Sequence, residues 1–508
     1  ANANIVYAAF GIFASGGIWK STNGGQSWSR LTNGLPDPAQ PNQGYNRIEL
    51  ALAPSTPDVL YASFSYGQKQ GDTINLLNSG MLGVWKTNNG GQSWTQVTTP
   101  KSTAQRNLDD NLTTPLGQQG YYDNSIIVHP NDPNTVFVAG LDIYKSTDGG
   151  NTWAQKSMWT GPDDTQGNPQ GLPYVHADHH EFAFDISTNP PTPYDGSDGG
   201  IARSRDLGNS WEVVNKDLGV TQFYTFAVHP TNPKILIGGT QDNGTPMTVD
   251  GSLNNWFEAA SGGDGWQTFF DVNNPNTLYT SVYGVNMLRL TYDYTTGQIT
   301  AFKRIGITDG SNGITQDDAQ GAGFFAPYEM SPNNPNVLVL GTYRLLKSTN
   351  RGDSWTAISG NSSGPPIVSL AIAEGNDNVI WFATQNAEII KTENNGQSYT
   401  EVTGGNLPKR FVTDIEFDPS NTSTVYLTYS GYGSPHVFKS TNAGGNWTDI
   451  TNNLPDVPAN TIQVHPQQSN TLFLGTDIGV FMSEDGGQIW QPCVNGFPTV
   501  QTVALCWI

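Results

Sequence analysis

The chain is poor in cysteine, in basic residues and in long apolar runs, and each shortage excludes a class of protein. Two cysteines among 508 residues rule out a scaffold built on many disulfides. No apolar run reaches the roughly 18 residues that a membrane helix needs. Against 44 acidic residues there are only 23 basic ones, and the formal net charge of −21 would repel nucleic acid and anionic membranes. We therefore expect neither nucleic-acid binding nor membrane insertion.

Glycine, proline and aromatic residues are abundant instead. The chain has 57 Gly and 32 Pro, 11% aromatic residues and only 13% charged residues. This composition is typical of many short strands joined by tight turns, and it predicts an all-β protein. The chain begins at Ala1 without an initiator Met, so we expect a secreted or cell-surface protein whose signal peptide has been removed.

A nine-residue sequence, KSTDGGNTW, ends at Trp153, and seven sequences like it occur elsewhere in the chain. They end at Trp28, Trp94, Trp211, Trp355, Tyr399, Trp447 and Trp490. In each box the first Ser or Thr and the Asp or Asn can accept hydrogen bonds from backbone groups of the turn, a Gly supplies positive φ, and the aromatic residue packs between sheets. We interpret the boxes as structural hairpins.

The sequence around each box also repeats, as four short alternating runs separated by turns. Residues 47–97 show the pattern as RIELALAP, LYASFS, GVWKT and SWTQV. Ten such units, of about fifty residues each, cover the chain. One four-stranded sheet cannot cover its own apolar faces, so the units must stack, and periods of this kind indicate the blades of a β-propeller.

The two ends of the chain complement one another. The first unit starts on its second strand, NIVYAAF, and the last is followed by a first-strand pattern, TVQTVALCWI. We therefore predict one ten-bladed ring over residues 1–508, closed by pairing of these two strands, with two smaller propellers as the alternative. Cys493 and Cys506 would then lie on different strands, which makes a disulfide between them unfavourable.

The boxes resemble Asp-box (BNR) repeats, which occur in sialidases, in xyloglucan-active glycoside hydrolases and in sortilin-type receptors. The unit count and ring closure are most similar to the sortilin-type ten-bladed propeller, although the cysteine-rich module of the animal receptors is missing. The resemblance to the xyloglucan-active family implies a catalytic Asp in a TDIGG sequence. GTDIG at 475–479 resembles it and makes Asp477 a candidate, although the family carries this motif in its first blade.

Polar residues gather where three consecutive units enter their first strands and leave their second strands. In a propeller these loops open on one face near the central axis, so we expect them to converge. The candidate ligand-binding residues there are His176, His179, Asp195, Asp198, Gln222, Tyr224, Gln241 and Asn243, joined by Tyr122 and Asp123 from the preceding unit.

The carboxylates of this group permit two chemistries. In a glycoside hydrolase two carboxylates act as acid and base or as acid and nucleophile, and Asp178, Asp242 and Asp264 join Asp477 as catalytic candidates. No cofactor is required, but a transition metal could bind to His176, Asp178 and His179, and the Asp-Gly loops suit calcium. A third interpretation is that these residues only satisfy backbone groups at the mouth of the channel.

Strand alternation in HADHHEFAFD places His180 on the face of Phe182 and Phe184. This pattern predicts a buried, structural His180 and an accessible His176 or His179.

As the main function we predict a secreted propeller that presents a polar and aromatic face to a glycan or an extracellular protein, or that serves in a cell-surface assembly. A polysaccharide-degrading glycoside hydrolase with paired Asp carboxylates is the alternative. The sequence determines neither the ligand nor the oligomeric state.

Overall fold

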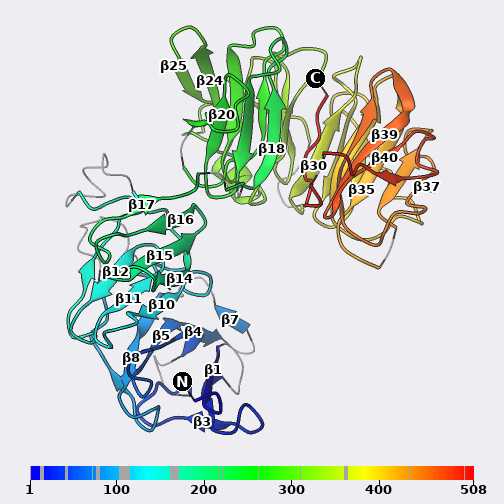
Figure 1. Ribbon diagram of the computed structural model, residues 1–508. Coiled ribbons are helices and arrows are strands. Elements are labelled where there is room, and N and C mark those ends of the chain that lie inside the picture. The colour runs from blue at the N-terminus through cyan, green and yellow to red at the C-terminus, as the bar shows by residue number, and fades with distance from the viewer. Residues whose placement is uncertain are drawn as a thin grey trace. The chain divides into compact units, whose positions relative to one another are not determined.

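The computed structural model describes residues 2–11, 16–39, 44–70, 73–75, 80–101, 115–160, 171–216, 218–219, 221–260, 262–308, 310–359, 364–433, 435–496 and 498–507. They form two compact units, residues 1–220 and 221–508. Within the described residues there are nine four-stranded sheets, one three-stranded sheet and one two-stranded ribbon (Figure 1). All ladders between neighbouring strands are antiparallel, which confirms the predicted all-β fold of propeller blades.

The described part of the first unit contains four of these sheets and the ribbon. In sheet order its strands are β1 (Val6–Phe10), β2 (Gly17–Ser21) and β3 (Ser29–Leu31); β4 (Tyr45–Leu52), β5 (Leu60–Tyr66), β8 (Met81–Thr87) and β9 (Thr95–Gln96); β10 (Ser125–Val128), β11 (Val136–Ala139), β12 (Ile143–Ser146) and β13 (Ala154–Gln155); β14 (His179–Asp185), β15 (Thr192–Ser197), β16 (Gly200–Arg203) and β17 (Glu212–Val213); and the ribbon β6 (Gln68–Gln70) and β7 (Thr73–Asn75).

The second unit contains six sheets in its described residues. Their strands are β18 (Phe223–Val228), β19 (Leu236–Thr240), β20 (Thr245–Thr248) and β21 (Phe257–Ala260); β22 (Thr268–Phe270), β23 (Thr277–Ser281), β24 (Met287–Asp293) and β25 (Gln298–Arg304); β26 (Tyr328–Met330), β27 (Leu338–Gly341), β28 (Leu345–Ser348) and β29 (Thr356–Ala357); β30 (Ile367–Ile372), β31 (Ile380–Thr384), β32 (Ile389–Thr392) and β33 (Thr400–Glu401); β34 (Val412–Asp418), β35 (Asn421–Tyr429), β36 (Val437–Ser440) and β37 (Thr448–Asp449); and β38 (Ala459–His465), β39 (Gln468–Thr476), β40 (Gly479–Ser483) and β41 (Gln491–Pro492).

The second strands carry the core of both units. β11, β23, β27 and β31 are buried along their whole length, because each is covered by the sheets on either side. The fourth strands are mostly exposed, and most of them are as short as β9, β17 and β33, although β25 has seven residues. Each blade therefore runs from an inner first strand to an outer fourth strand.

In the second unit the first strands of all six sheets line one cavity of about 560 Å³. The final segment, 503–507, lines the same cavity. Thr502 N–H donates to Thr476 O at 2.8 Å, Trp507 Nε1 donates to Val464 O at 2.9 Å, and the Cys506 thiol accepts a hydrogen bond from the backbone of Val228. The segment thus bonds to β38 through Val464 and to β18 through Val228.

This position of the C-terminal segment differs from the predicted one. We expected it to pair with residues 5–10, but its hydrogen bonds join it to the second unit, and the neighbour of β1 in the described sheets is β2. A first-strand pattern is compatible with a position between any two blades. The pattern alone therefore could not predict which two blades the C-terminal segment joins. Cys493 and Cys506 are both free.

The boxes form the predicted hairpin turns. In the box that ends at Trp153, Ser146 Oγ accepts from Gly150 N–H at 2.8 Å, and Asp148 Oδ1 accepts from Thr152 N–H at 2.9 Å. Trp153 Nε1 donates to Thr98 O of the preceding sheet at 2.7 Å. This box therefore caps its own turn, and its tryptophan ties that turn to the neighbouring blade. Trp355, Trp447 and Trp490 also donate to a carbonyl of the preceding sheet, whereas Trp28 donates to Gly25 O within its own box.

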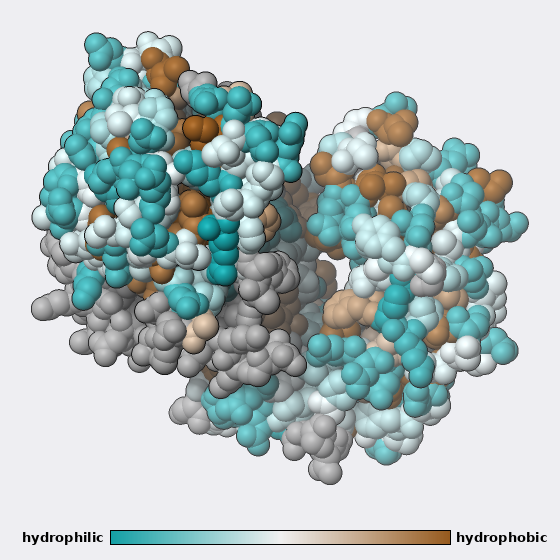
Figure 2. Space-filling model, turned by 90° about the horizontal axis from the view of Figure 1, so that it is seen from below, coloured by the Kyte–Doolittle hydropathy of each residue, from teal (hydrophilic) through white to brown (hydrophobic). Residues whose placement is uncertain are grey.

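The rest of the fold contains little besides strands. The described residues include one short helix, α1 (Gln316–Gln320), and no helix among them is long and apolar enough to cross a membrane. On the face drawn in Figure 2, hydrophobic residues occur as separate spots among hydrophilic ones.

Candidate functional site

In the first unit, a β-bulge at the start of β14 turns the two adjacent histidines in different directions. His179 pairs with Ser197 and Glu181 pairs with Gly196, so His180 is the extra residue. His179 is fully buried and its Nδ1 lies 2.7 Å from Asp195 Oδ2, whereas the His180 side chain is 35% exposed. The alternation argument was therefore wrong for His180, because the bulge breaks the two-residue period at this point. Of the two histidines offered as accessible, His179 is buried and His176 is half-buried.

His180 contributes to a polar network around Asp198. Its Nε2 lies 2.7 Å from Asp198 Oδ1, and Tyr122 Oη donates to Asp198 Oδ2 at 2.8 Å. The rings of His180 and Tyr122 pack edge to face, with centroids 4.9 Å apart. The hydrogen bond to Asp198 raises the pKa of His180. The charged form of this histidine is thus favoured beside the carboxylate.

Two further carboxylates lie beside Asp198. Asp178 has one carboxylate oxygen within 4.8 Å of one of Asp198, and it adopts φ +63°, which places it in the left-handed region. The Gln119 amide contacts Asp178 Oδ1 and lies 3.4 Å from Asp123 Oδ2. We call Asp123, Asp178 and Asp198 the acidic cluster.

Burial makes the ionised forms of two of these carboxylates unfavourable. Asp123 is 0% exposed, and burial together with the charge of Asp178 raises its pKa to about 9. Burial, and then the charge of Asp198, raises the pKa of Asp178. Asp123 is therefore protonated and neutral at neutral pH, and the raised pKa of Asp178 likewise favours its neutral form.

The predicted transition-metal set does not assemble around Asp178. His179 is buried against Asp195, and His176 Nδ1 lies 3.0 Å from the carbonyl of Ala177. The His176 ring also packs so closely on Gly199 that a Cβ there would meet its Cβ at 2.2 Å. His176, Asp178 and His179 thus have different neighbours, and Asp195 and His179 together form a buried structural pair.

In the second unit, Asp242 and Asp264 lie on two loops that are tied together. Asp242 follows β19 with φ +58°, and its N–H donates to Asp264 Oδ1 at 2.7 Å. Gly265 N–H donates to Thr240 O, and a Cβ at Gly265 would meet Gly244 O at 2.1 Å, so only glycine fits this crossing. These contacts therefore fix the two loops relative to one another and hold the Asp264 carboxylate at the backbone of Asp242.

Aromatic side chains lie beside these carboxyl groups. Trp266 stacks on Phe325 with centroids 4.2 Å apart, and Phe324 contacts both Phe325 and Tyr283. Phe324 is 63% exposed and Tyr283 is 42% exposed. We call Trp266, Tyr283, Phe324 and Phe325 the aromatic shelf. Sequence reasoning missed all but the Gly-Asp-Gly-Trp loop, since these residues come together from three loops.

Tyr224 links the aromatic shelf to the carboxyl groups. Its ring packs against Phe325 at 4.8 Å and Trp266 at 5.6 Å. Burial, and then the charges of Asp264 and Asp242, raises the pKa of Tyr224 to about 12. Its hydroxyl therefore stays protonated and can donate a hydrogen bond toward a carboxylate or a ligand.

The other predicted residues of this unit are held by local contacts. Gln241 N–H donates to Gln222 O at 3.0 Å, and Asn243 Nδ2 donates to Gln241 O at 3.0 Å. Asp477 Oδ1 accepts from Asn460 at 3.0 Å and from Gln501 at 3.1 Å. The predicted convergence of all these loops involves both units and stays a prediction.

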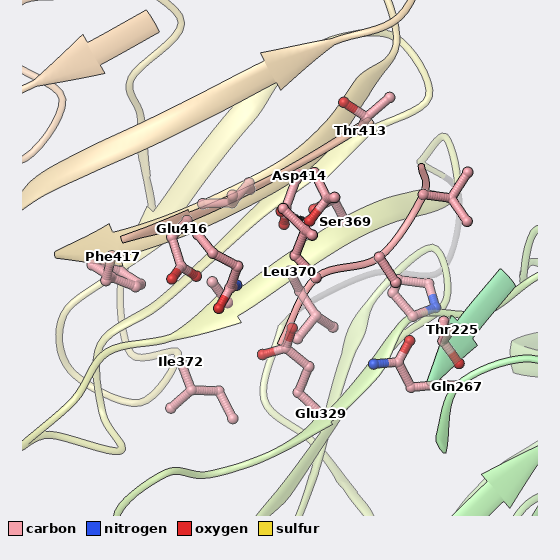
Figure 3. Close-up of a pocket in the computed structure, with 18 of the residues that line it drawn as sticks. Thr225, Gln267, Glu329, Ser369, Leu370, Ile372, Thr413, Asp414, Glu416 and Phe417 are labelled. Carbon is pink, nitrogen blue, oxygen red and sulfur yellow. Dashed lines mark hydrogen bonds between the residues drawn. The ribbon is translucent and has the colours of Figure 1, made fainter. Parts of the chain in front are cut away.

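A group of carboxylates that the sequence analysis did not single out lines the cavity of the second unit. Glu329 of β26 and Asp414 and Glu416 of β34 project into it (Figure 3). Asp414 Oδ2 accepts from Thr461 Oγ1 at 2.9 Å and from Ile462 N–H at 3.0 Å. Burial, then the charge of Asp414, raises the pKa of Glu329 to about 8. In the sequence, this group could have been found from acidic residues that lie inside the first strands of two units.

Comparison with known proteins gives relatives of one kind, and no family model matches the chain. The chain is 22% identical to the "Xyloglucanase" of Hypocrea jecorina (strain QM6a) over 572 aligned positions, which cover 99% of this chain and 62% of that protein. A "Probable oligoxyloglucan-reducing end-specific xyloglucanase" of Neosartorya fischeri is 28% identical over 144 positions, 24% of this chain and 17% of that protein. The chain thus spans less than two thirds of either relative.

Among solved structures, the "GH74 (NkGH74) enzyme" of Niastella koreensis has a TM-score of 0.33 and 16% identity, over 97% of this chain and 84% of that one. The "GH74 xyloglucanase" of Xanthomonas campestris has a TM-score of 0.30 and 14% identity, over 96% of this chain and 78% of that one.

The match along nearly the whole chain overturns our main functional prediction. A non-catalytic propeller for binding or cell-surface assembly was expected, but the similarity is to a xyloglucanase. Of the resemblances given above, the distant one to xyloglucan-active glycoside hydrolases is supported, and the expected extracellular protein partner gains no support.

Proposed function

We propose that the protein is a secreted glycoside hydrolase of Asp-box repeats that acts on a xyloglucan-type β-glucan. The observation that carries the proposal is the similarity to a xyloglucanase over 99% of the chain. Because the chain spans 62% of that relative, the site must be argued from the residues present here.

The polar group of the second unit has the parts that glycoside hydrolysis requires. Such hydrolysis needs one carboxylic acid to protonate the leaving oxygen and a second carboxylate to act as base or nucleophile. Asp264 is held in place by the N–H of Asp242. We assign Asp264 the role of base or nucleophile and Asp242 the role of acid.

The aromatic shelf supplies a binding surface beside these two carboxyl groups. Sugar rings present flat apolar C–H faces that pack well on aromatic rings. Exposed Phe324 and Tyr283 lie at the outer end of the shelf, and Tyr224 lies between the shelf and the carboxyl groups. A glucan chain lying along the shelf would bring a glycosidic bond to Asp242 and Asp264.

Asp→Asn exchange tests these roles. We expect Asp242→Asn and Asp264→Asn each to lower the rate of xyloglucan hydrolysis by about 10²- to 10⁴-fold, the usual contribution of a general acid or base. The matched control is Asp293→Asn on the outer β24–β25 hairpin, which should keep the wild-type rate. Release of reducing ends is the measurement, with circular dichroism to confirm folding. Full activity in both variants would refute the assignment, and a loss confined to Asp477→Asn would move the site to that carboxylate.

A further inference from the structure

The loop between β25 and β26 carries two rings of the aromatic shelf, Phe324 and Phe325. It contains α1, and its last part is attached to the turn of Tyr283, because Gly284 N–H donates to Phe324 O at 2.7 Å. Phe324 is 63% exposed, so neighbouring side chains cover little of its ring. An exposed ring on a loop binds a flat ligand well only if the backbone beneath it is held in one position, because ordering a mobile ring on binding costs affinity.

Asp318 of α1 is the buried anchor of this loop. Its side chain is 0% exposed, and both of its carboxylate oxygens bond to Arg344: Nε donates to Oδ1 at 2.5 Å, and Nη2 donates to Oδ2 at 2.7 Å. Oδ2 also accepts from Thr315 N–H at 2.8 Å. Burial acts against ionisation of Asp318, but the hydrogen bonds from Arg344 and Thr315 outweigh it and lower the pKa of this carboxyl group. The pair is therefore ionised, and its planar two-point geometry fixes the orientation of the carboxylate as well as its position.

Arg344 belongs to a tight turn that continues the buried strand β27. Thr342 N–H donates to Arg344 O at 2.9 Å, and Arg344 N–H donates to Thr342 Oγ1 at 3.2 Å. The ring of Tyr343, between them, packs on the backbone of Gly321, where a Cβ would meet a ring atom at 1.4 Å. The turn thus holds the loop in α1 and again at Gly321, shortly before Phe324.

We propose that Asp318 and Arg344 are a positioning pair for the substrate-binding surface: they hold α1, and through it the backbone that leads to Phe324, so that the Phe324 ring meets the face of a sugar of the glucan chain. The pair acts through Phe324 and supplies no proton or nucleophile to the reaction. An anchor that served stability alone could be apolar, because burying an ion pair contributes little net stability. The inference rests on the proposed function, since its ligand is the glucan.

Arg344→Lys and Asp318→Asn test the proposal in the full chain. Lysine keeps the charge opposite Asp318 but not the two-point fork, and asparagine keeps an acceptor for Thr315 N–H but not the charge, so both variants should fold. We expect each to raise KM for xyloglucan about threefold to tenfold, the cost of ordering a mobile ring and its backbone, with kcat changed less than about twofold. Release of reducing ends gives KM and kcat, and circular dichroism confirms folding.

A double-variant cycle separates positioning from a general structural role. Because the pair acts through Phe324, Arg344→Lys should raise KM by less than about twofold in the Phe324→Ala background. A loosened fold would instead raise KM by the same factor in both backgrounds, and that additive result would overturn the proposal. The matched control is Arg289→Lys, which alters an ion pair with Asp353 whose arginine is 20% exposed, against 21% for Arg344, and should keep the wild-type KM.

Binding measured apart from hydrolysis distinguishes this proposal from the proposed function. Calorimetric titration with xyloglucan oligosaccharides, in the Asp264→Asn background, gives Kd with and without Arg344→Lys, and we expect Arg344→Lys to weaken binding about threefold to tenfold. Wild type that leaves xyloglucan intact would contradict hydrolysis alone, and weaker binding caused by Arg344→Lys would still support the positioning role. Equal Kd values would overturn the positioning role whatever the rate of hydrolysis. Folded wild-type protein that neither cleaves xyloglucan nor binds the oligosaccharides would overturn both.

Discussion

Glu329 in the cavity of the second unit gives a prediction that can be worked out in numbers. Its pKa is about 8 in the folded protein and 4.5 when unperturbed. Between these values the folded chain holds a proton that the unfolded chain has released, so stability falls as pH rises and levels out above about pH 8. At 1.36 kcal/mol per pKa unit, the difference is about 5 kcal/mol. Glu329 is only partly buried, so solvent screens the carboxylate and this value is an upper limit.

Glu329→Gln removes this proton without changing the shape of the side chain. The amide oxygen can still accept the hydrogen bond from the backbone of Ile372. We expect the variant to lose less stability than wild type between pH 5 and pH 9, by up to about 5 kcal/mol, in urea unfolding followed by tryptophan fluorescence. Asp414 and Glu416 also have raised pKa values, so a smaller fall should remain. Glu401→Gln, on the exposed strand β33, is the matched control and should follow wild type. Parallel curves for Glu329→Gln and wild type would refute the reasoning.

Three further predictions concern packing and binding. Ser146→Ala leaves the buried Gly150 N–H without its acceptor and should lower the free energy of unfolding by about 1–3 kcal/mol in urea denaturation; no change would contradict the capping role of the boxes. Asp195→Ala leaves His179 buried without its partner and should cost about 3–5 kcal/mol in the same assay; a smaller cost would show that the pair contributes little. Phe324→Ala removes the most exposed ring of the aromatic shelf and should raise KM for xyloglucan several-fold with little change in kcat; an unchanged KM would exclude the shelf from substrate binding.

The architecture could be predicted from sequence because it depends on local, repeated signals. Each box contains its own capping residues: Ser146 and Asp148 each accept from a backbone N–H four positions further along the chain. Each buried second strand is a short apolar run between turns, as β31 is. The position of the C-terminal segment was not predictable in the same way, because its partners Val464 and Val228 are set by how the blades close.

Site residues were harder to predict because their positions depend on exceptions to regular structure. A single bulged residue exchanged the expected roles of His179 and His180. Glu329, Asp414 and Glu416 come together only across two blades, and the aromatic shelf only across three loops. The class of function also could not be read from the boxes, since they form turns of the scaffold and a fold does not determine a function.

Mass spectrometry of xyloglucan incubated with the full chain in ¹⁸O-labelled water tests the central claim most directly. Hydrolysis adds one water to each bond that is broken, so each fragment with a newly formed reducing end should carry one ¹⁸O there, and Asp264→Asn should abolish the products. Intact polysaccharide after prolonged incubation with folded wild-type protein would contradict the account.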